Sequence, residues 1–299
     1  MGCEICVGIA TTGRPEILNH TLRYAHEALD SKGVVLICAR DETDVDRDTI
    51  AGIPGNTIIL IASERYGLSV QRNIILDHAQ KYLDPELIIF FDDDFFVHRT
   101  YIDHIVSVFR RSPEVVGVTG RVLLDGNKSC GIDIQTAQQA LNTLPQSALD
   151  GGVSECYSTY GCNMSFRFST VMQSGTRFNE AFPYYSWLED LDFSRRMRKI
   201  GRIVRSNSAC GVHLAAKTGR TSGVRFGYSQ VANSTYLLKE GLIDHAKYLN
   251  VTVRPIIMNV LRWIRPESYV DRRGRLWGNL IAIRDMITGQ LDPKKIERL

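Results

Sequence analysis

The 299-residue sequence contains no apolar run near the roughly 20 residues that a membrane-spanning helix needs. Its opening residues, MGCEICVGIATTGRP, have neither the charged start nor the cleavage site of a signal peptide. The seven cysteines are an odd number scattered along a long chain, which fits reduced thiols better than a disulfide framework. We therefore expect a protein that stays in the cytosol.

The sequence also has little net charge. A formal charge of +3 is too small for a dedicated nucleic-acid binder, so nucleic acid is not an expected partner. The apolar fraction of 44% is ordinary for a globular protein. We expect one continuous core, in an α/β catalytic domain with a small appendage.

Apolar runs alternate with helical patterns in the first third of the chain. The runs CEICVGIAT, VVLICAR, TIILIAS and ELIIFF are nearly continuous, as strands are when helices cover both faces of a sheet. Helical patterns begin at Pro15 and near Leu68. This alternation predicts a buried parallel sheet with crossover helices.

Polar residues follow each of these predicted strands. In open sheets of this kind, ligands bind at the carboxyl ends of the strands. A nucleotide would find donors, acceptors and a metal site among the residues after the four strands, which are Thr11, Thr12 and Arg14; Arg40, Asp41 and Glu42; Ser63, Glu64 and Arg65; and Asp92, Asp93 and Asp94.

The strongest local signal is IIFFDDDFF, an apolar strand that runs into three carboxylates. If the strand persists, Asp92 and Asp94 point the same way and Asp93 points to the other face. Packed like charges are costly without a cation, and hard carboxylate oxygens suit Mg²⁺ or Mn²⁺. The alternative is a solvated acidic strand end or helix cap, and phosphatases of another fold also end a strand in paired aspartates.

A second signal is YYSWLEDLDFSRRMRKIG. Phe193, Met197 and Ile200 have helical spacing, which places Glu189 and Asp190 near the first turn of a helix. Acidic residues there can be a structural cap favoured by the helix dipole. Alternatively, one of them is a general base that takes a proton from an attacking hydroxyl.

These signals occur in order with three other segments: the opening strand that leads to TTGRP, GLSVQRN, and GCNMSFR followed by RFNEAF. With these three segments, DDD and EDLDFSRRMRKIG in this order, the chain resembles the family 2 inverting glycosyltransferases of bacterial polysaccharide biosynthesis. The resemblance covers roughly residues 5 to 205. The resemblance implies the GT-A fold, a Rossmann-type mixed, mainly parallel sheet flanked by helices, here with a C-terminal helical extension. The implied divisions are a catalytic domain at 1–225, with a nucleotide-binding half at 1–114 and an acceptor-binding half at 115–225, and the extension at 226–299.

The resemblance also implies roles for particular residues. Asp92 and Asp94 form the metal-binding pair, Asp190 is the catalytic base, and Glu189 positions the base or the acceptor. The nucleotide-sugar site is implied to comprise Thr11, Arg14, Asp41, Arg72, Asp92, Asp93, Asn163, Lys217 and Arg220, and His213 is implied to be a further metal ligand.

Three of these roles have open structural alternatives. Asn163 is either near the donor sugar or a turn-forming residue, and His213 is either a ligand or a structural histidine. Lys217 and Arg220 either fold over the pyrophosphate or lie in a solvated loop. ARDETD, around Asp41, departs from the Asp-Asn-Ser-like turn that is usual in the family, so the nucleotide base stays open.

The C-terminal segment is locally basic. From Val251 onward the chain has ten Lys or Arg residues against five Asp or Glu, with Trp263 and Trp277 among aliphatic residues. Such a segment lies on an anionic membrane surface, or its apolar residues pack on the core or across a dimer. RGRLWGNLIAIRDMITG resembles the tails of bacterial transferases that extend polyprenyl-linked saccharides, which implies a lipid-linked acceptor at the inner membrane face.

The sequence therefore predicts a metal-dependent transferase that uses a nucleotide-diphosphate sugar, with a UDP-sugar favoured, and Mn²⁺ or Mg²⁺. One alternative is a sugar nucleotidyltransferase, but TTGRPE is too poor in glycine and lysine for the usual triphosphate loop. The other is a non-catalytic nucleotide-sugar-binding scaffold.

Overall fold

The computed structural model describes residues 4–62, 64–217 and 221–299. The chain divides into two compact units. Unit 1 comprises Met1–Tyr66, Val70–Arg177 and Phe193–Gly219, and unit 2 comprises Gly67–Ser69, Phe178–Asp192 and Arg220–Leu299.

Unit 1 is built on a mixed sheet with the strand order β3-β2-β1-β4-β8-β6-β9-β5, and β7 pairs with β9. Strands β1 to β4 pair in parallel, β8 runs antiparallel between β4 and β6, and β6 pairs in parallel with β9. The predicted mixed, mainly parallel sheet is thus confirmed. The strands are β1 (Ile5–Thr11), β2 (Gly33–Ala39), β3 (Thr57–Ile61), β4 (Leu87–Asp92), β5 (Phe95–Val97), β6 (Val115–Asp125), β7 (Val153–Glu155), β8 (Asn163–Arg167) and β9 (Arg202–His213).

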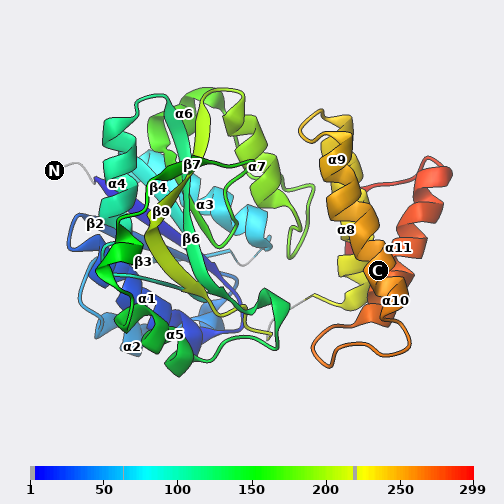
Figure 1. Ribbon diagram of the computed structural model, residues 1–299, viewed down its shortest axis with the longest axis horizontal. Coiled ribbons are helices and arrows are strands. Elements are labelled where there is room, and N and C mark those ends of the chain that lie inside the picture. Colours follow the sequence, from blue (N-terminus) through cyan, green and yellow to red (C-terminus); the bar gives the residue numbers. More distant parts are fainter. Residues whose placement is uncertain (1–3, 63, 218–220) are drawn as a thin grey trace. The chain divides into compact units, whose positions relative to one another are not determined.

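Helices cover both faces of this sheet (Figure 1). Ile9 of β1 belongs to the same buried cluster as Leu22 and Ile105, whereas a Cβ on Gly8 would lie 2.8 Å from Ile75 on the opposite face. The side chains of β1 therefore alternate between two apolar layers, which explains its continuous apolar sequence. The helices of this part of the chain are α1 (Pro15–Leu29), α2 (Arg47–Ala51), α3 (Leu68–Tyr82), α4 (Tyr101–Arg111), α5 (Ile134–Asn142), α6 (Phe168–Ser174) and α7 (Glu189–Arg198).

Helix α7 forms where the spacing of apolar residues predicted it. Phe193 and Met197 are fully buried on its inner face. Ile200 lies beyond the last helical residue and is 49% exposed, so its assignment to the apolar face of the helix was wrong. The chain leaves the helix before Ile200 because Gly201 and Arg202 already lead into β9.

Unit 2 carries the C-terminal helices α8 (Gly223–Lys239), α9 (His245–Tyr248), α10 (Arg254–Leu261) and α11 (Arg272–Ile287), drawn from yellow to red in Figure 1. A π-helical segment, Leu249–Val253, joins α9 to α10, and α11 packs along α8. Over the described parts of the chain, no helix is both long enough and apolar enough to cross a membrane. Short 3₁₀ turns occupy Glu42–Asp44, Gly126–Lys128, Gln146–Leu149 and Pro293–Arg298.

Candidate active site

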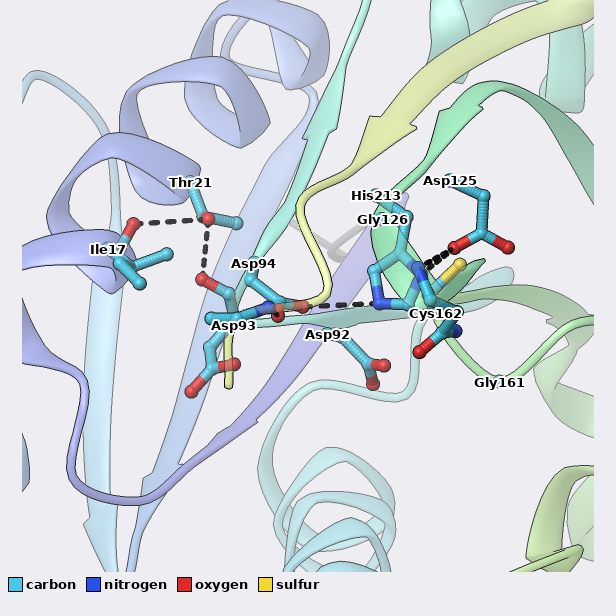
Figure 2. A network of polar contacts seen from close by, with 12 residues as sticks. Ile17, Thr21, Asp92, Asp93, Asp94, Asp125, Gly126, Gly161, Cys162 and His213 are labelled. Atoms are coloured by element: carbon cyan, nitrogen blue, oxygen red, sulfur yellow. Dashed lines mark hydrogen bonds and ion pairs between the residues drawn. The ribbon is translucent and has the colours of Figure 1, made fainter. Parts of the chain in front are cut away.

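The three consecutive aspartates lie at the carboxyl end of β4, in the middle of the sheet of unit 1. The strand ends at Asp92, and Asp93 and Asp94 form a turn before β5, so the expected strand alternation stops one residue into the triplet. The turn nevertheless separates the side chains as expected. Asp93 accepts a hydrogen bond from the Thr11 hydroxyl at 2.7 Å and pairs with Arg14 at 2.7 Å, whereas Asp94 faces His213 (Figure 2).

Asp92, Asp94 and His213 each offer a ligand atom within 4.8 Å of those of the other two. His213 is the last residue of β9, more than a hundred positions along the chain from the aspartates. Strand β5, which follows the acidic turn, pairs antiparallel with β9 and sets Phe95 opposite His213. This register brings the imidazole beside the turn.

Asp125 orients the imidazole. It ends β6 and lies opposite His213 in the parallel β6–β9 pair. The Nδ1 of His213 lies 3.0 Å from Oδ1 of Asp125, and Tyr160 donates its hydroxyl to the other carboxylate oxygen at 2.9 Å. Nε2 therefore faces the acidic turn, 3.5 Å from Oδ1 of Asp94 (Figure 2). A carboxylate behind a histidine is the usual support for a metal-binding imidazole.

Arginine side chains also bind one oxygen each of Asp94 and Asp92. Oδ2 of Asp94 accepts from Arg14 at 2.9 Å and from the backbone N–H of Ala216 at 2.8 Å. Oδ1 of Asp92 accepts from Arg72 at 2.9 Å, and the Arg72 side chain is only 1% exposed. Arg72 also donates to the carbonyl oxygen of Gly161. These contacts fix the directions of both metal-ligand candidates.

The electrostatics of the cluster favour positive charge. Burial opposes the charge of His213, but hydrogen bonds to Asp125 and Asp94 and the negative charges of Asp94 and Asp92 outweigh burial and raise its pKa to about 10. Burial also raises the pKa of Asp93 to about 7, although Arg14 acts in the opposite direction. A proton on His213 neutralises part of the carboxylate charge. A divalent cation on the same ligands is the other way to neutralise it, so the donor set fits a metal ion.

The residues predicted to bind the nucleotide differ in the contacts that their side chains make. Thr11 and Arg14 are bonded to the acidic turn, and Arg72 is buried against Asp92. Asp41 lies on the loop after β2, where its carboxylate accepts from the backbone N–H of Thr43 at 2.9 Å. Their contacts with a nucleotide stay predictions.

Sequence reasoning missed a carboxylate that organises these loops. Asp44 is 4% exposed and accepts the backbone N–H groups of Gly13, Arg40 and Asp41. It therefore ties the loop after β1 to the loop after β2. The capping pattern of Asp41 with Asp44 three residues later, in DETD, was the available signal. Beside this loop, the Arg40 guanidinium lies 4.0 Å from the ring centroid of Tyr66, which is 39% exposed.

Asn163 and Lys217 have defined partners in unit 1. Asn163 is fully buried, and its side-chain oxygen accepts from Tyr101, Thr119 and the N–H of Gly120. The side chain is thus occupied within the interior. Lys217 donates to the carbonyl oxygen of Gly126 at 3.0 Å, one residue after Asp125. Arg220 lies outside the described residues.

Glu189 and Asp190 belong to unit 2 and begin α7. Glu189 is 4% exposed, whereas Asp190 is half-buried and accepts from the N–H of Leu191 at 2.8 Å. The loop before them holds three non-glycine residues at positive φ: Tyr184 at 57°, Ser186 at 50° and Leu188 at 70°. Backbone strain of this kind persists only where the surroundings impose it, and it concentrates at functional sites.

Hydrogen bonds within unit 2 impose this loop conformation. The backbone N–H of Leu68 donates to the carbonyl oxygen of Tyr184 at 2.8 Å, and that of Ser69 donates to the Ser186 hydroxyl at 3.3 Å. From α8, Asn233 donates to the carbonyl oxygen of Trp187 at 2.7 Å. The two carboxylates therefore follow a loop that is held in place on both sides.

The sheet order and the acidic turn after β4 define a GT-A-like fold, the fold that the motif resemblance implied. Two solved structures of S. aureus TarS share it. One is 12% identical, with a TM-score of 0.55, and the match covers 90% of this chain and 44% of that chain. The other, of TarS 1–349, is 11% identical, with a TM-score of 0.56, and the match covers 99% and 90% of the two chains. The chain thus spans less than half of the longer TarS chain.

No protein-family model matches the sequence, and neither does any curated protein. The likeness to TarS is therefore a likeness of fold, and it confirms the predicted GT-A-like architecture.

Arg72 offers a test of how the acidic turn is held. Because its guanidinium is buried, Arg72→Met is expected to leave Asp92 without its cation and to lower the free energy of unfolding by about 3 kcal/mol, at the low end for a broken buried pair because Asp92 is 29% exposed. Urea unfolding followed by circular dichroism measures the loss. The matched control is Arg47→Met, whose exposed pair with Glu42 is screened by solvent and should contribute far less to stability. Equal effects of the two substitutions would contradict the assigned role.

Proposed function

We propose that this protein is a metal-dependent inverting glycosyltransferase that moves a sugar from a nucleotide-diphosphate sugar to an acceptor hydroxyl. The observation that supports it best is the convergence of Asp92, Asp94 and His213 at the carboxyl end of a central strand in a GT-A-like fold. A ligand in such a sheet binds at this edge.

Asp92, Asp94 and His213 are the residues that would hold Mn²⁺ or Mg²⁺. When bound, the cation would neutralise the negative charge that develops on the departing nucleoside diphosphate. Asp125 keeps the Nε2 of His213 turned toward the carboxylates, and Arg14 and Arg72 keep one oxygen of each carboxylate engaged. The chain thus presents preorganised ligands rather than flexible acidic side chains.

Asp190 is the proposed general base, and Glu189 positions the base or the acceptor. The acceptor oxygen forms a bond to the anomeric carbon while the bond from that carbon to the diphosphate oxygen breaks, and the hydroxyl proton passes to Asp190. One displacement inverts the anomeric centre, so an α-linked donor gives a β-linked product. The half-buried carboxylate of Asp190 is accessible for this role, whereas that of Glu189 is enclosed.

For the donor, we propose a UDP-sugar. The Arg40–Tyr66 pair beside the loops after β2 and β3 presents a planar surface on which a nucleotide base could stack. Asp41 lies on the adjacent loop, and Lys217 lies beside the Asp125–His213 pair with an ammonium group suited to a phosphate.

For the acceptor, we propose a saccharide linked to a polyprenyl lipid, in exopolysaccharide or capsule assembly at the inner face of the cell membrane. Unit 2 contains a cluster of three aromatic side chains, two of which belong to the strained loop. The ring centroid of Trp187 lies 5.0 Å from that of Phe226 and 6.5 Å from that of Tyr185. Tyr185 is 45% exposed, so this group offers an apolar platform close in sequence to Asp190.

The test is turnover with a panel of UDP-, GDP- and dTDP-sugars, each with Mn²⁺, Mg²⁺ or EDTA. We expect release of one nucleoside diphosphate, strictly dependent on the cation and restored when metal is added back. Release of pyrophosphate from a sugar phosphate and a nucleoside triphosphate would instead identify a nucleotidyltransferase. Binding of a nucleotide-sugar without cleavage under any condition would favour a non-catalytic scaffold.

A further inference from the structure

The C-terminal helices of unit 2 bury several polar side chains beside an apolar cluster. Asn259 of α10 and Asn279 of α11 are fully buried, and the first donates its amide to the second at 2.9 Å. Asn279 in turn donates to the backbone carbonyl of Gly227 in α8 at 2.7 Å. Asp285 is also fully buried and accepts from the Tyr228 hydroxyl at 3.0 Å. Hydrogen bonds, and not only apolar contacts, therefore join these helices.

Small residues bring the same helices together. A Cβ on Gly227 would lie 2.0 Å from the carbonyl oxygen of Arg275, and a Cβ on Gly278 would lie 2.0 Å from that of Val224. The backbones of α8 and α11 are thus in direct contact. Glycine contacts and side-chain hydrogen bonds between helices are the means by which helices associate in lipid, where apolar burial gives no driving force.

The outer surface of α10 and α11 carries two stripes of exposed apolar residues. On the helix that leads into and forms α10, the exposed residues recur every three or four positions and so form one stripe: Leu249, Val253, Ile257, Val260 and Leu261. On α11, Trp277, Leu280 and Ile287 form a second stripe with exposed fractions of 61%, 50% and 79%. We call these two stripes, with Trp263 and Ile264 between the helices, the apolar face.

The two stripes meet at the connection between the helices. Trp263 and Ile264 follow α10 and are 50% and 76% exposed. Arg273, one turn before Trp277 on the second stripe, lies with its guanidinium 5.8 Å from the ring centroid of Trp263. Trp263 and Arg273 therefore link the end of the first stripe to the start of the second, and a large group of exposed apolar side chains marks an interaction site.

The exposed charges on this surface are mainly positive. Between residues 249 and 287, all of which the structure describes, the exposed basic residues are Arg254, Arg262, Arg265, Arg273 and Arg284. The exposed acidic residue in the same range is Asp271, which caps α11 by accepting from the N–H of Gly274. A second copy of this face would bring arginine against arginine, so the face is not complementary to itself.

We propose that the apolar face is a membrane-docking surface that lies on a bilayer containing anionic lipids. The apolar side chains enter the boundary between headgroups and acyl chains, and the arginines meet the lipid phosphates. The helices lie on the bilayer rather than cross it, because none of those described is long and apolar enough to span. Contact with a bilayer also accounts for the exposure of Ile264 and Ile287 in a segment whose helices bury Asn259, Asn279 and Asp285.

The test uses the full chain and liposome flotation, without donor or acceptor. Wild-type protein is expected to float with vesicles of phosphatidylcholine and phosphatidylglycerol, and far less with phosphatidylcholine alone. Ile264→Ser with Ile287→Ser should weaken binding by more than about tenfold, since both side chains would otherwise enter the bilayer. Arg262→Gln with Arg273→Gln should remove the preference for anionic vesicles, and added salt should do the same.

The matched controls are Tyr82→Ser, at an apolar residue of unit 1 that is 61% exposed, and Arg110→Gln, at an arginine of unit 1 that is 70% exposed; both should bind as wild type does. Circular dichroism verifies that each variant is folded. Flotation that is absent, or unchanged in Ile264→Ser with Ile287→Ser, overturns the proposal. If light scattering instead shows a dimer that these serines dissociate, the face is a contact between two copies. Neither result bears on sugar transfer, which is measured separately.

Discussion

Replacing Asp190 with Asn is expected to lower kcat by about 10² to 10⁴-fold, the usual contribution of a general base, while donor binding is preserved. The amide keeps the size of the side chain and its place at the start of α7 but cannot take the proton of the acceptor hydroxyl. Initial rates of nucleoside diphosphate release measure the loss, and titration calorimetry with the donor measures binding. Asp48→Asn, at an exposed position in the first turn of α2, is the matched control and should behave as wild type does.

Glu189→Gln distinguishes the role of Glu189 from that of the neighbouring Asp190. If Glu189 only positions the acceptor, the variant should raise KM for the acceptor more than it lowers kcat. The assignment of the base would be wrong if Asp190→Asn kept the wild-type kcat and Glu189→Gln lost it. A loss of donor affinity in Asp190→Asn would likewise show that this carboxylate binds rather than catalyses.

The sequence predicted the first half of the sheet well because its signals are local. Strands β1 to β4 are nearly continuous apolar runs, which can be recognised in the sequence without knowing which strands they pair with. The pairing of β6 with β9 is different, since it joins residues about ninety positions apart and its register shifts at three places. Nothing in either segment alone indicates that Asp125 and His213 lie side by side.

The candidate metal ligands were predictable, but what supports them was not. Asp92, Asp94 and His213 were proposed from motifs, and the structure brings them together. Arg72 was expected to reach the nucleotide, yet it is buried against Asp92. A sequence shows that an arginine is present but not whether its partner is a ligand or a carboxylate of the same chain, because that choice depends on long-range packing.

The C-terminal segment shows the same limit. Its composition indicated apolar and basic residues, with a membrane surface and internal packing as open alternatives. Only the structure shows that Asn259 and Asn279 face inward while Ile264 and Ile287 face outward. Composition does not indicate which face of an amphipathic helix is buried, because the same residues recur with the same helical period in either case.

The second large effect is expected at the metal ligands, and the aspartate triplet contains its own control. Asp94→Asn should weaken Mn²⁺ binding by more than about 100-fold, since it removes a direct ligand, whereas Asp125→Asn should weaken it by about 10 to 100-fold, as the loss of a carboxylate behind a ligating histidine does. Asp93→Asn should keep the affinity for Mn²⁺, because its carboxylate faces Thr11 and Arg14. Electron paramagnetic resonance of free Mn²⁺ measures all three affinities.

The stability of the same variants should follow a different order. Asp93→Asn removes a charged partner of the partly buried Arg14, so it is expected to lower the melting temperature while Mn²⁺ binding survives. Wild-type protein should gain stability from added Mn²⁺, and Asp94→Asn should not, because only a state that binds the ion is stabilised by it. If Asp93→Asn lost Mn²⁺ binding as completely as Asp94→Asn, all three aspartates would contribute to the metal site. The assignment of Asp93 to Thr11 and Arg14, and of Asp94 to the metal ion, would then be wrong.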